Sequence, residues 1–207
     1  MTVSMKERLG VLGGTFNPVH TGHLVLAQNA METFDLSKVL FVPSELPPHK
    51  DHVEILSSNH RLEMLKDAVE DNMNFDISEV ETARGDVSYT IDTVKSLMKK
   101  HPEAELFFII GSDSLIELYS WRKIDELLDL CAFITIVRPG LDMEELLTRD
   151  LGLRADHQDK LRKNMVQGHL MDISSSDIRH RVAEGMSIKY LVPPCVEMYI
   201  AEHNLYK

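Results

Sequence analysis

Residues 9–23 read LGVLGGTFNPVHTGH, an apolar run that passes through two glycines into a segment with helical spacing. The run at 9–12 predicts a buried strand, and the apolar side chains within 21–34 fall on one stripe of a helix. Gly13 and Gly14 let the backbone approach a bound group closely. The helix start adds unpaired N–H groups and the positive end of the helix dipole, so this unit predicts a phosphate site.

The rest of the chain repeats this alternation of strands and helices. Further buried strands are expected at 39–42, 75–80, 106–110 and 133–137, and further amphipathic helices at 59–70 and 91–100. The pattern predicts an α/β fold: a single domain over 1–207 with a Rossmann-like, doubly wound parallel sheet and helices on both faces. Residues 141–168 are less patterned and rich in charge, and we interpret them as a helical excursion of that domain.

Composition narrows the classes of function. The 207 residues carry a formal net charge of −11, the wrong sign for a broad grip on a nucleic-acid backbone. No apolar run is long enough for a membrane span or a signal peptide, so we expect a cytoplasmic protein without a membrane partner. Cys131 and Cys195 form no C-x-x-C pair, which disfavours a zinc ribbon or a disulfide framework. A small polyanionic substrate remains compatible with this charge if basic groups gather locally.

The glycine turn does not match the common phosphate motifs. It lacks the G-x-G-x-x-G spacing and no G-K-[ST] follows it, so another design must hold the phosphate. His20 and His23 stand three apart at the helix start and can both donate N–H bonds to one bound group. We leave their charge open, because a helix start disfavours an imidazolium while a triphosphate favours it. Two helix-capping histidines, or less readily a zinc site, are the alternatives.

Two motifs together carry a family resemblance. Residues 13–23, GGTFNPVHTGH, resemble the (H/T)xGH signature of a nucleotidyltransferase superfamily, and residues 173–179, ISSSDIR, resemble its second signature, ISSTxIR. Within it, the chain is most similar to the bacterial nicotinate mononucleotide adenylyltransferases, through PPHK at 47–50, SYT at 88–90, FIIGSD at 108–113 and the single tryptophan, Trp121. Asn17 stands where many relatives have Asp, and Ser176 where the motif has Thr.

The resemblance implies an enzyme that transfers AMP from ATP to nicotinate mononucleotide, with Mg²⁺ accompanying the ATP and no metal ligands from the protein. It leaves the oligomeric state open and allows a homo-oligomer. Catalytic roles are implied for His20, His23, Lys50 and Arg179. The implied ATP site comprises these four residues with Gly13, Gly14, Thr15, Phe16, Gly111, Asp113, Ser175, Ser176 and Ile178. The implied mononucleotide site comprises Gly14, Thr15, Tyr89, Thr90 and Trp121.

Taken one at a time, several of these residues can also be explained by purely structural roles. Lys50 suits a solvated loop, Thr90 and Asp113 suit helix caps, and Trp121 suits core packing. Competing functions are a phosphopantetheine adenylyltransferase, a catalytically silent nucleotide sensor and a tRNA-charging enzyme, for which the chain is too small and too acidic. The set of phosphate-binding side chains argues against a sensor, which has no need of transition-state donors.

Overall fold

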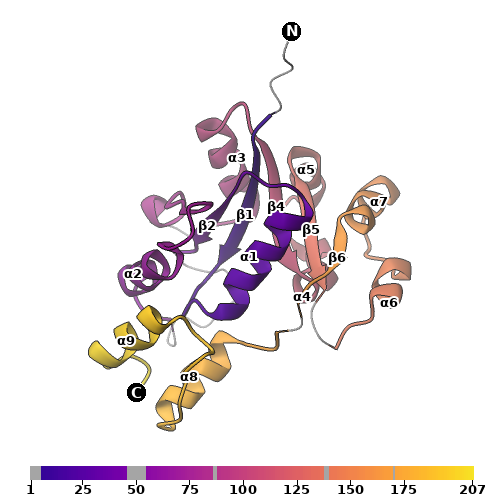
Figure 1. Cartoon of the computed structure of the whole chain (residues 1–207). Helices are drawn as coiled ribbons and strands as arrows, with labels where there is room; N and C mark the ends of the chain where they lie inside the picture. The colour runs from indigo at the N-terminus through magenta and orange to yellow at the C-terminus, as the bar shows by residue number, and fades with distance from the viewer. Residues whose placement is uncertain (1–5, 46–54, 86–87, 138–139, 170) are drawn as a thin grey trace.

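A computed structural model describes residues 6–45, 55–85, 88–137, 140–169 and 171–207. Its centre is a parallel sheet of six strands in the order β3-β2-β1-β4-β5-β6 (Figure 1). In chain order the strands are β1 (Arg8–Gly14), β2 (Lys38–Pro43), β3 (Phe75–Ile77), β4 (Glu105–Gly111), β5 (Ala132–Val137) and β6 (Met165–Gln167). This is the doubly wound order, in which the direction of winding reverses between β1 and β4.

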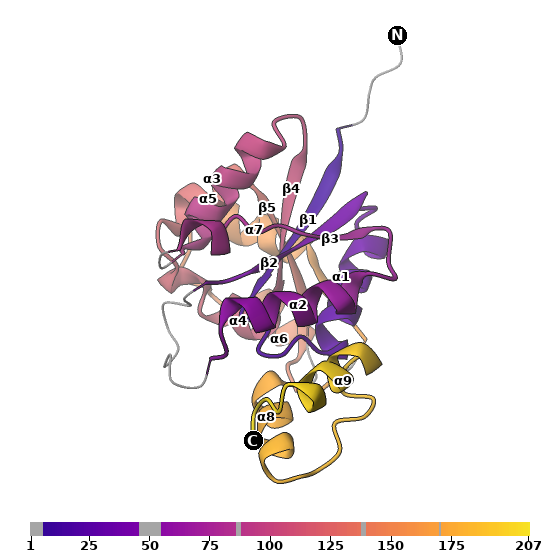
Figure 2. The ribbon, with the colours of Figure 1, turned by 90° about the vertical axis from the view of Figure 1, so that its left-hand side faces the viewer.

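Helices cover both faces of the sheet, as Figures 1 and 2 show. Side chains of α1 (Thr21–Thr33), α2 (Ser58–Val69), α8 (Ser175–Ala183) and α9 (Pro194–Glu202) belong to the apolar cluster on one face. Side chains of α3 (Thr90–Lys100), α4 (Ser112–Ile116), α5 (Ile124–Leu130), α6 (Met143–Thr148) and α7 (Ala155–Lys163) belong to the cluster on the other. The predicted α/β sheet with two covered faces is therefore confirmed.

Strand β4 shows why the sequence folds into two covered faces. Leu106, Phe108 and Ile110 belong to one core cluster, whereas Phe107 and Ile109 belong to the other. Successive side chains of a strand point to opposite faces, so an unbroken apolar run must be covered on both. Burial of such side chains contributes about 1.5–3 kcal/mol each, which makes LFFII a main anchor of the fold.

Two expectations about the strands need correction. Strand β3 covers only Phe75–Ile77, so the predicted strand at 75–80 is too long. Residues 141–168, expected to be helical, contain α6 and α7 but also the edge strand β6, which pairs with β5 through Thr135 and Met165. A three-residue strand covers less than two periods of side-chain alternation, so a sequence pattern cannot reveal it.

The parallel order brings the carboxyl ends of all six strands to one edge of the sheet. Strand β1 ends at Gly14 and β4 at Gly111, and α1 and α4 begin just beyond them. Helix α8 lies at the same edge in both views (Figures 1 and 2). In sheets of this kind ligands bind beyond the carboxyl ends where the winding reverses. Among the described residues, no helix has the length and apolarity to span a membrane.

Candidate active site

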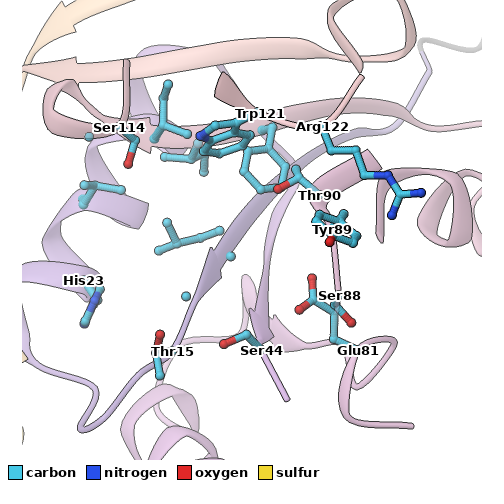
Figure 3. Close-up of a pocket in the computed structure, with 18 residues that line it drawn as sticks. Thr15, His23, Ser44, Glu81, Ser88, Tyr89, Thr90, Ser114, Trp121 and Arg122 are labelled. Atoms are coloured by element: carbon cyan, nitrogen blue, oxygen red, sulfur yellow. The ribbon is translucent and has the colours of Figure 1, made fainter. Parts of the chain in front are cut away.

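An open pocket of about 320 Å³ lies at the carboxyl ends of β1 and β4 (Figure 3). It unites segments that are far apart in the sequence: the glycine turn, the start of α3, the end of β4 and the residues after the short helix Leu118–Ser120. Eight of the residues predicted from the sequence line it: Gly13, Gly14, Thr15, His23, Tyr89, Thr90, Gly111 and Trp121. The pocket therefore lies where the order of the strands predicts a ligand site.

The two histidines of the first motif pack face to face. Their rings are stacked with centroids 3.7 Å apart, and Nδ1 of His23 accepts a hydrogen bond from the backbone N–H of His20 at 3.2 Å. His20 is buried and occupies the N-cap position of α1, while His23 is half-buried and lines the pocket. Gly22 permits this stack, because a Cβ there would lie 3.0 Å from the His20 ring. The capping alternative and the binding role can therefore coexist.

Phe16 forms the floor of the glycine turn. Its ring is buried, meets His23 edge-on at 5.0 Å, and leaves no room for a side chain at Gly14, whose Cβ would lie 3.0 Å from it. The backbone of Phe16 has φ = 47°, a left-handed conformation that residues with a Cβ adopt only at a cost in conformational energy. Tertiary contacts must therefore hold this turn in its shape.

The second motif packs directly against the first, although about 150 residues separate them. Ser174 caps α8 by accepting a hydrogen bond from the N–H of Asp177. Ser175 Oγ donates to the carbonyl oxygen of Pro18 at 2.9 Å, and Arg179 donates to that of Asn17 at 3.1 Å. The two motifs therefore meet at one edge of the sheet.

Other predicted residues of the second motif and of β4 lie around this contact. Ile178 is fully buried, so its side chain is part of the core, and Ser176 is exposed within hydrogen-bond reach of Ser174. Asp113 is exposed in the first turn of α4, where Gly111 rather than Asp113 takes the N-cap position. Lys50 lies outside the residues that the structure describes. The roles expected of these four residues stay predictions.

The other end of the pocket is built from rings. Trp121 meets Phe108 edge-on at 6.0 Å and Phe133 at 6.1 Å, and it remains half-buried (Figure 3). Tyr89 is at the N-cap position of α3, and the guanidinium of Arg122 lies 4.4 Å from the centre of its ring. Trp121 thus packs on the core and also offers a surface to the pocket. This end suits a flat ring better than a phosphate.

Two lining residues with charged side chains were missed by the sequence analysis. Arg122 follows Trp121 directly, so its place beside the tryptophan was a usable signal. Glu81 is buried, and Thr93 Oγ1 donates a hydrogen bond to its carboxylate. Burial raises the pKa of Glu81, although the bond from Thr93 and the charge of Arg84 oppose the shift. Nothing in the sequence around Glu81 distinguishes it from a surface acid.

Metal binding by the protein itself would require a cluster of ligating side chains among the described residues. Among them, no three His, Cys, Asp or Glu side chains are arranged to hold a metal ion. The glycine turn and the start of α8 instead present backbone N–H groups, imidazoles, serine hydroxyls and an arginine. Such donors bind phosphate oxygens.

Known proteins resemble this chain in sequence and in fold. Residues 11–181 match the cytidylyltransferase-like family. Two curated proteins named "Probable nicotinate-nucleotide adenylyltransferase" are similar over nearly the full length. The one from Desulfitobacterium hafniense (strain DSM 10664 / DCB-2) is 44% identical, over 97% of this chain and 96% of its own. The one from Halalkalibacterium halodurans is 46% identical, over 97% and 92%.

The chain belongs to the cytidylyltransferase-like family, among the nicotinate-nucleotide adenylyltransferases. The solved structure of the nicotinic acid mononucleotide adenylyltransferase of Plasmodium falciparum, complexed with NaAD, has a TM-score of 0.76 to this chain. It is 21% identical over 97% of both chains, a likeness that supports the Rossmann-like fold. The family resemblance inferred from the two motifs is thereby confirmed.

The pocket has two chemically different ends, one at the glycine turn and one at the aromatic residues, which we name the phosphate end and the acceptor end. The phosphate end comprises Gly13, Gly14, Thr15 and His23 of the pocket lining, with His20 stacked on His23. Outside the lining, the start of α8 contacts the turn at Pro18 and Asn17. The acceptor end comprises Glu81, Tyr89, Thr90, Trp121 and Arg122. The two ends share one open pocket, so two ligands bound there can meet.

Proposed function

We propose that this protein transfers AMP from ATP to nicotinate mononucleotide, forming nicotinate adenine dinucleotide and pyrophosphate in NAD biosynthesis. The observation that carries the proposal is one pocket that joins the phosphate end to the aromatic acceptor end. The curated relatives carry the name of this activity over nearly the whole chain. ATP suits the phosphate end, and a pyridine ring suits the acceptor end beside Trp121.

The chemistry needs no protein nucleophile. A phosphate oxygen of nicotinate mononucleotide, already ionised at neutral pH, attacks the α-phosphorus of ATP. The new bond joins that oxygen to the α-phosphorus, and the bond from the α-phosphorus to the bridging oxygen of the β-phosphate breaks. Pyrophosphate leaves with the electron pair. The protein's task is therefore to hold two anions in line and to stabilise the charge that builds on the leaving group.

We assign this task to the phosphate end. His23 lines the pocket, and the bond that its Nδ1 accepts from His20 orients its imidazole, which we propose as a hydrogen-bond donor to a phosphate oxygen. Arg179 extends from α8 to the turn, where its bond to Asn17 supports a role beside the phosphates. Ser176 at the start of α8 adds a hydroxyl donor, Ser175 adds its backbone N–H because its hydroxyl already donates to Pro18, and Lys50 adds a charge.

The residues present fit a metal that arrives with the substrate. The glycine turn and the α8 start provide mainly hydrogen-bond donors for phosphate oxygens, and the one carboxylate in the first turn of α8, Asp177, belongs to no metal-binding cluster among the described residues. Mg²⁺ bound to ATP supplies charge neutralisation on the phosphates. The protein's own residues then bind the remaining oxygens and orient the α-phosphate toward the acceptor.

At the acceptor end, Trp121 is proposed to stack on the pyridine ring. The N–H groups at the start of α3, with the Thr90 hydroxyl, are proposed to bind the nicotinate carboxylate. An anion at a helix N-terminus is stabilised by the helix dipole and by unpaired N–H groups. Asp92 lies in this first turn, so the site relies on the backbone donors rather than on a positive side chain of α3.

The test is pyrophosphate release by the purified protein with ATP, Mg²⁺ and one acceptor at a time: nicotinate mononucleotide, nicotinamide mononucleotide or phosphopantetheine. We expect the largest kcat/KM with the nicotinate compound. Release only with another acceptor would keep the transfer chemistry and discard the substrate. Nucleotide binding without pyrophosphate release in the presence of any of the three acceptors would favour the nucleotide sensor instead.

A further inference from the structure

A buried arginine lies beneath the phosphate end. Arg61, on α2, is 1% exposed, although arginine is almost never fully buried without a partner. Among the described residues it forms no ion pair, and its hydrogen bonds go to backbone carbonyl oxygens. Burial lowers its pKa, while the charge of Glu45 and the hydroxyl of Tyr206 oppose the shift. Burying a cation without an ion pair is unfavourable, so we expect its position to serve a function.

The guanidinium joins three segments at once. Nη1 donates to the carbonyl oxygen of Thr15 at 2.7 Å, Nη2 to that of Glu45 at 3.1 Å, and Nε to that of Leu56 at 3.0 Å. Leu56 in turn donates its N–H to Asn17 Oδ1 at 3.3 Å. The planar guanidinium thus fixes the glycine turn against the segments at Glu45 and Leu56. The ammonium group of a lysine is a point charge and cannot reproduce this three-point geometry.

The bond to Thr15 acts on the part of the turn that most needs support. Thr15 lines the pocket, and the next residue, Phe16, has the left-handed φ of 47°. The C=O of Thr15 and the N–H of Phe16 belong to one planar trans peptide and point in opposite directions. The bond to Arg61 therefore turns that N–H away from the guanidinium and polarises it as a donor.

We propose that Arg61 is a positioning residue for nucleotidyl transfer, holding the Thr15–Phe16 peptide in the orientation that the reacting phosphates require. Arg61 acts through the turn rather than by touching ATP. Its positive charge also lies behind the turn, where a bound polyanion offsets the cost of burying it. This inference rests on the proposed function and adds a residue to the machinery that carries it out.

Arg61→Lys is the decisive variant, because lysine keeps the charge and loses the three-point fork. We expect kcat per folded molecule to fall about 10- to 100-fold, as for a misplaced reacting group, with the KM for nicotinate mononucleotide changed less than about threefold. Arg61→Met, which also removes the charge, should lose at least as much. The measurements are steady-state rates, normalised to the folded fraction from thermal unfolding.

Arg162→Lys is the matched control. Arg162, on α7, is half-buried and also donates to a backbone carbonyl, that of Arg149, and to Gln158. It differs from Arg61 in its ion pair with Asp159, and it lies outside the pocket. We expect a lower Tm and an unchanged kcat. Wild-type kcat in Arg61→Lys would overturn the positioning role, as would failure of both Arg61 variants to fold, which would make Arg61 a residue of overall stability. Absence of nucleotidyl transfer by the wild-type protein would instead contradict the proposed function.

Discussion

The two ends of the pocket are held in place by different kinds of contact. The glycine turn at the phosphate end receives hydrogen bonds from Arg61 on α2 and from Ser175 and Arg179 on α8. Tyr206, one residue from the end of the chain, adds a bond from its hydroxyl to Asn17 Oδ1 at 2.9 Å. The acceptor end is instead held by ring packing around Trp121 and by Arg122 over Tyr89.

The buried charges at the two ends also differ. A cation, Arg61, lies behind the phosphate end, whereas a carboxylate, Glu81, lines the acceptor end. Directional bonds fix atoms that must be aligned during a reaction, while ring faces supply affinity with a looser geometry. From this contrast we expect substitutions at the phosphate end to lower kcat, and substitutions at the acceptor end to change the affinity for the acceptor or the stability of the fold.

The largest effect is expected at His23. Replacing His23 with Ala removes the imidazole from the pocket and should lower kcat by about 10²-fold or more, as for loss of one transition-state donor. The fold should survive, because His23 is half-buried and the core beneath it is formed by Phe16. Steady-state kinetics with nicotinate mononucleotide measures the effect.

The control for this variant is His203→Ala, which removes an exposed histidine that packs on Tyr199, away from the pocket. It should keep the wild-type kcat. Near wild-type turnover of His23→Ala would contradict this difference between the two ends, because it would show that the phosphate end does not need the His23 imidazole as a donor.

A smaller effect, on binding, is expected at Trp121. Trp121→Ala should raise the KM for nicotinate mononucleotide by about tenfold, since an aromatic pair contributes about 0.5–1.5 kcal/mol beyond the area that it buries. The KM for ATP and the kcat should change much less. Trp121→Phe retains a ring face and should recover most of the affinity. An unchanged KM, or collapse of the fold, would assign Trp121 to core packing with Phe108 and Phe133 alone.

The fold was largely predictable because its signals are contiguous in the sequence. Apolar runs such as 106–110 and the turn at 13–23 carry their pattern within one segment, and the structure has strands and a strand-turn-helix unit there. Strand β6 was missed because its three residues make sense only beside β5. The pocket was predictable to the extent that motifs mark it, as with the glycine turn, Tyr89 and Trp121.

The residues that hold the site in place were harder to find. Arg61 donates to carbonyls 5, 16 and 46 residues away, and backbone carbonyls leave no trace in the sequence. One signal was available: Arg61 lies four and seven residues before Leu65 and Ala68, on the stripe of α2 that is buried. A charged side chain on an apolar stripe marks a buried polar contact without naming its partner.

The smallest effect is expected at Glu81, and it sharpens the contrast between the buried charges. Because burial raises the folded-state pKa of Glu81 above its ordinary value of 4.5, the folded protein binds this proton more tightly than the unfolded chain. The stability from that proton is fully present below pH 4.5 and is lost as the pH rises through the folded pKa. Glu81→Gln should therefore raise the Tm at pH 7.5, by up to about 4 °C.

This gain should shrink as the pH falls toward 4, where Glu81 itself becomes neutral, and thermal unfolding at both pH values measures it. The amide oxygen of the introduced glutamine can still accept the bond from Thr93, so the substitution changes the charge more than the contact. Glu79→Gln, at an exposed position two residues earlier, is the control and should leave the Tm unchanged at both pH values. An equal gain for Glu81→Gln at pH 4 and 7.5 would mean that packing, not a buried charge, distinguishes the acceptor end.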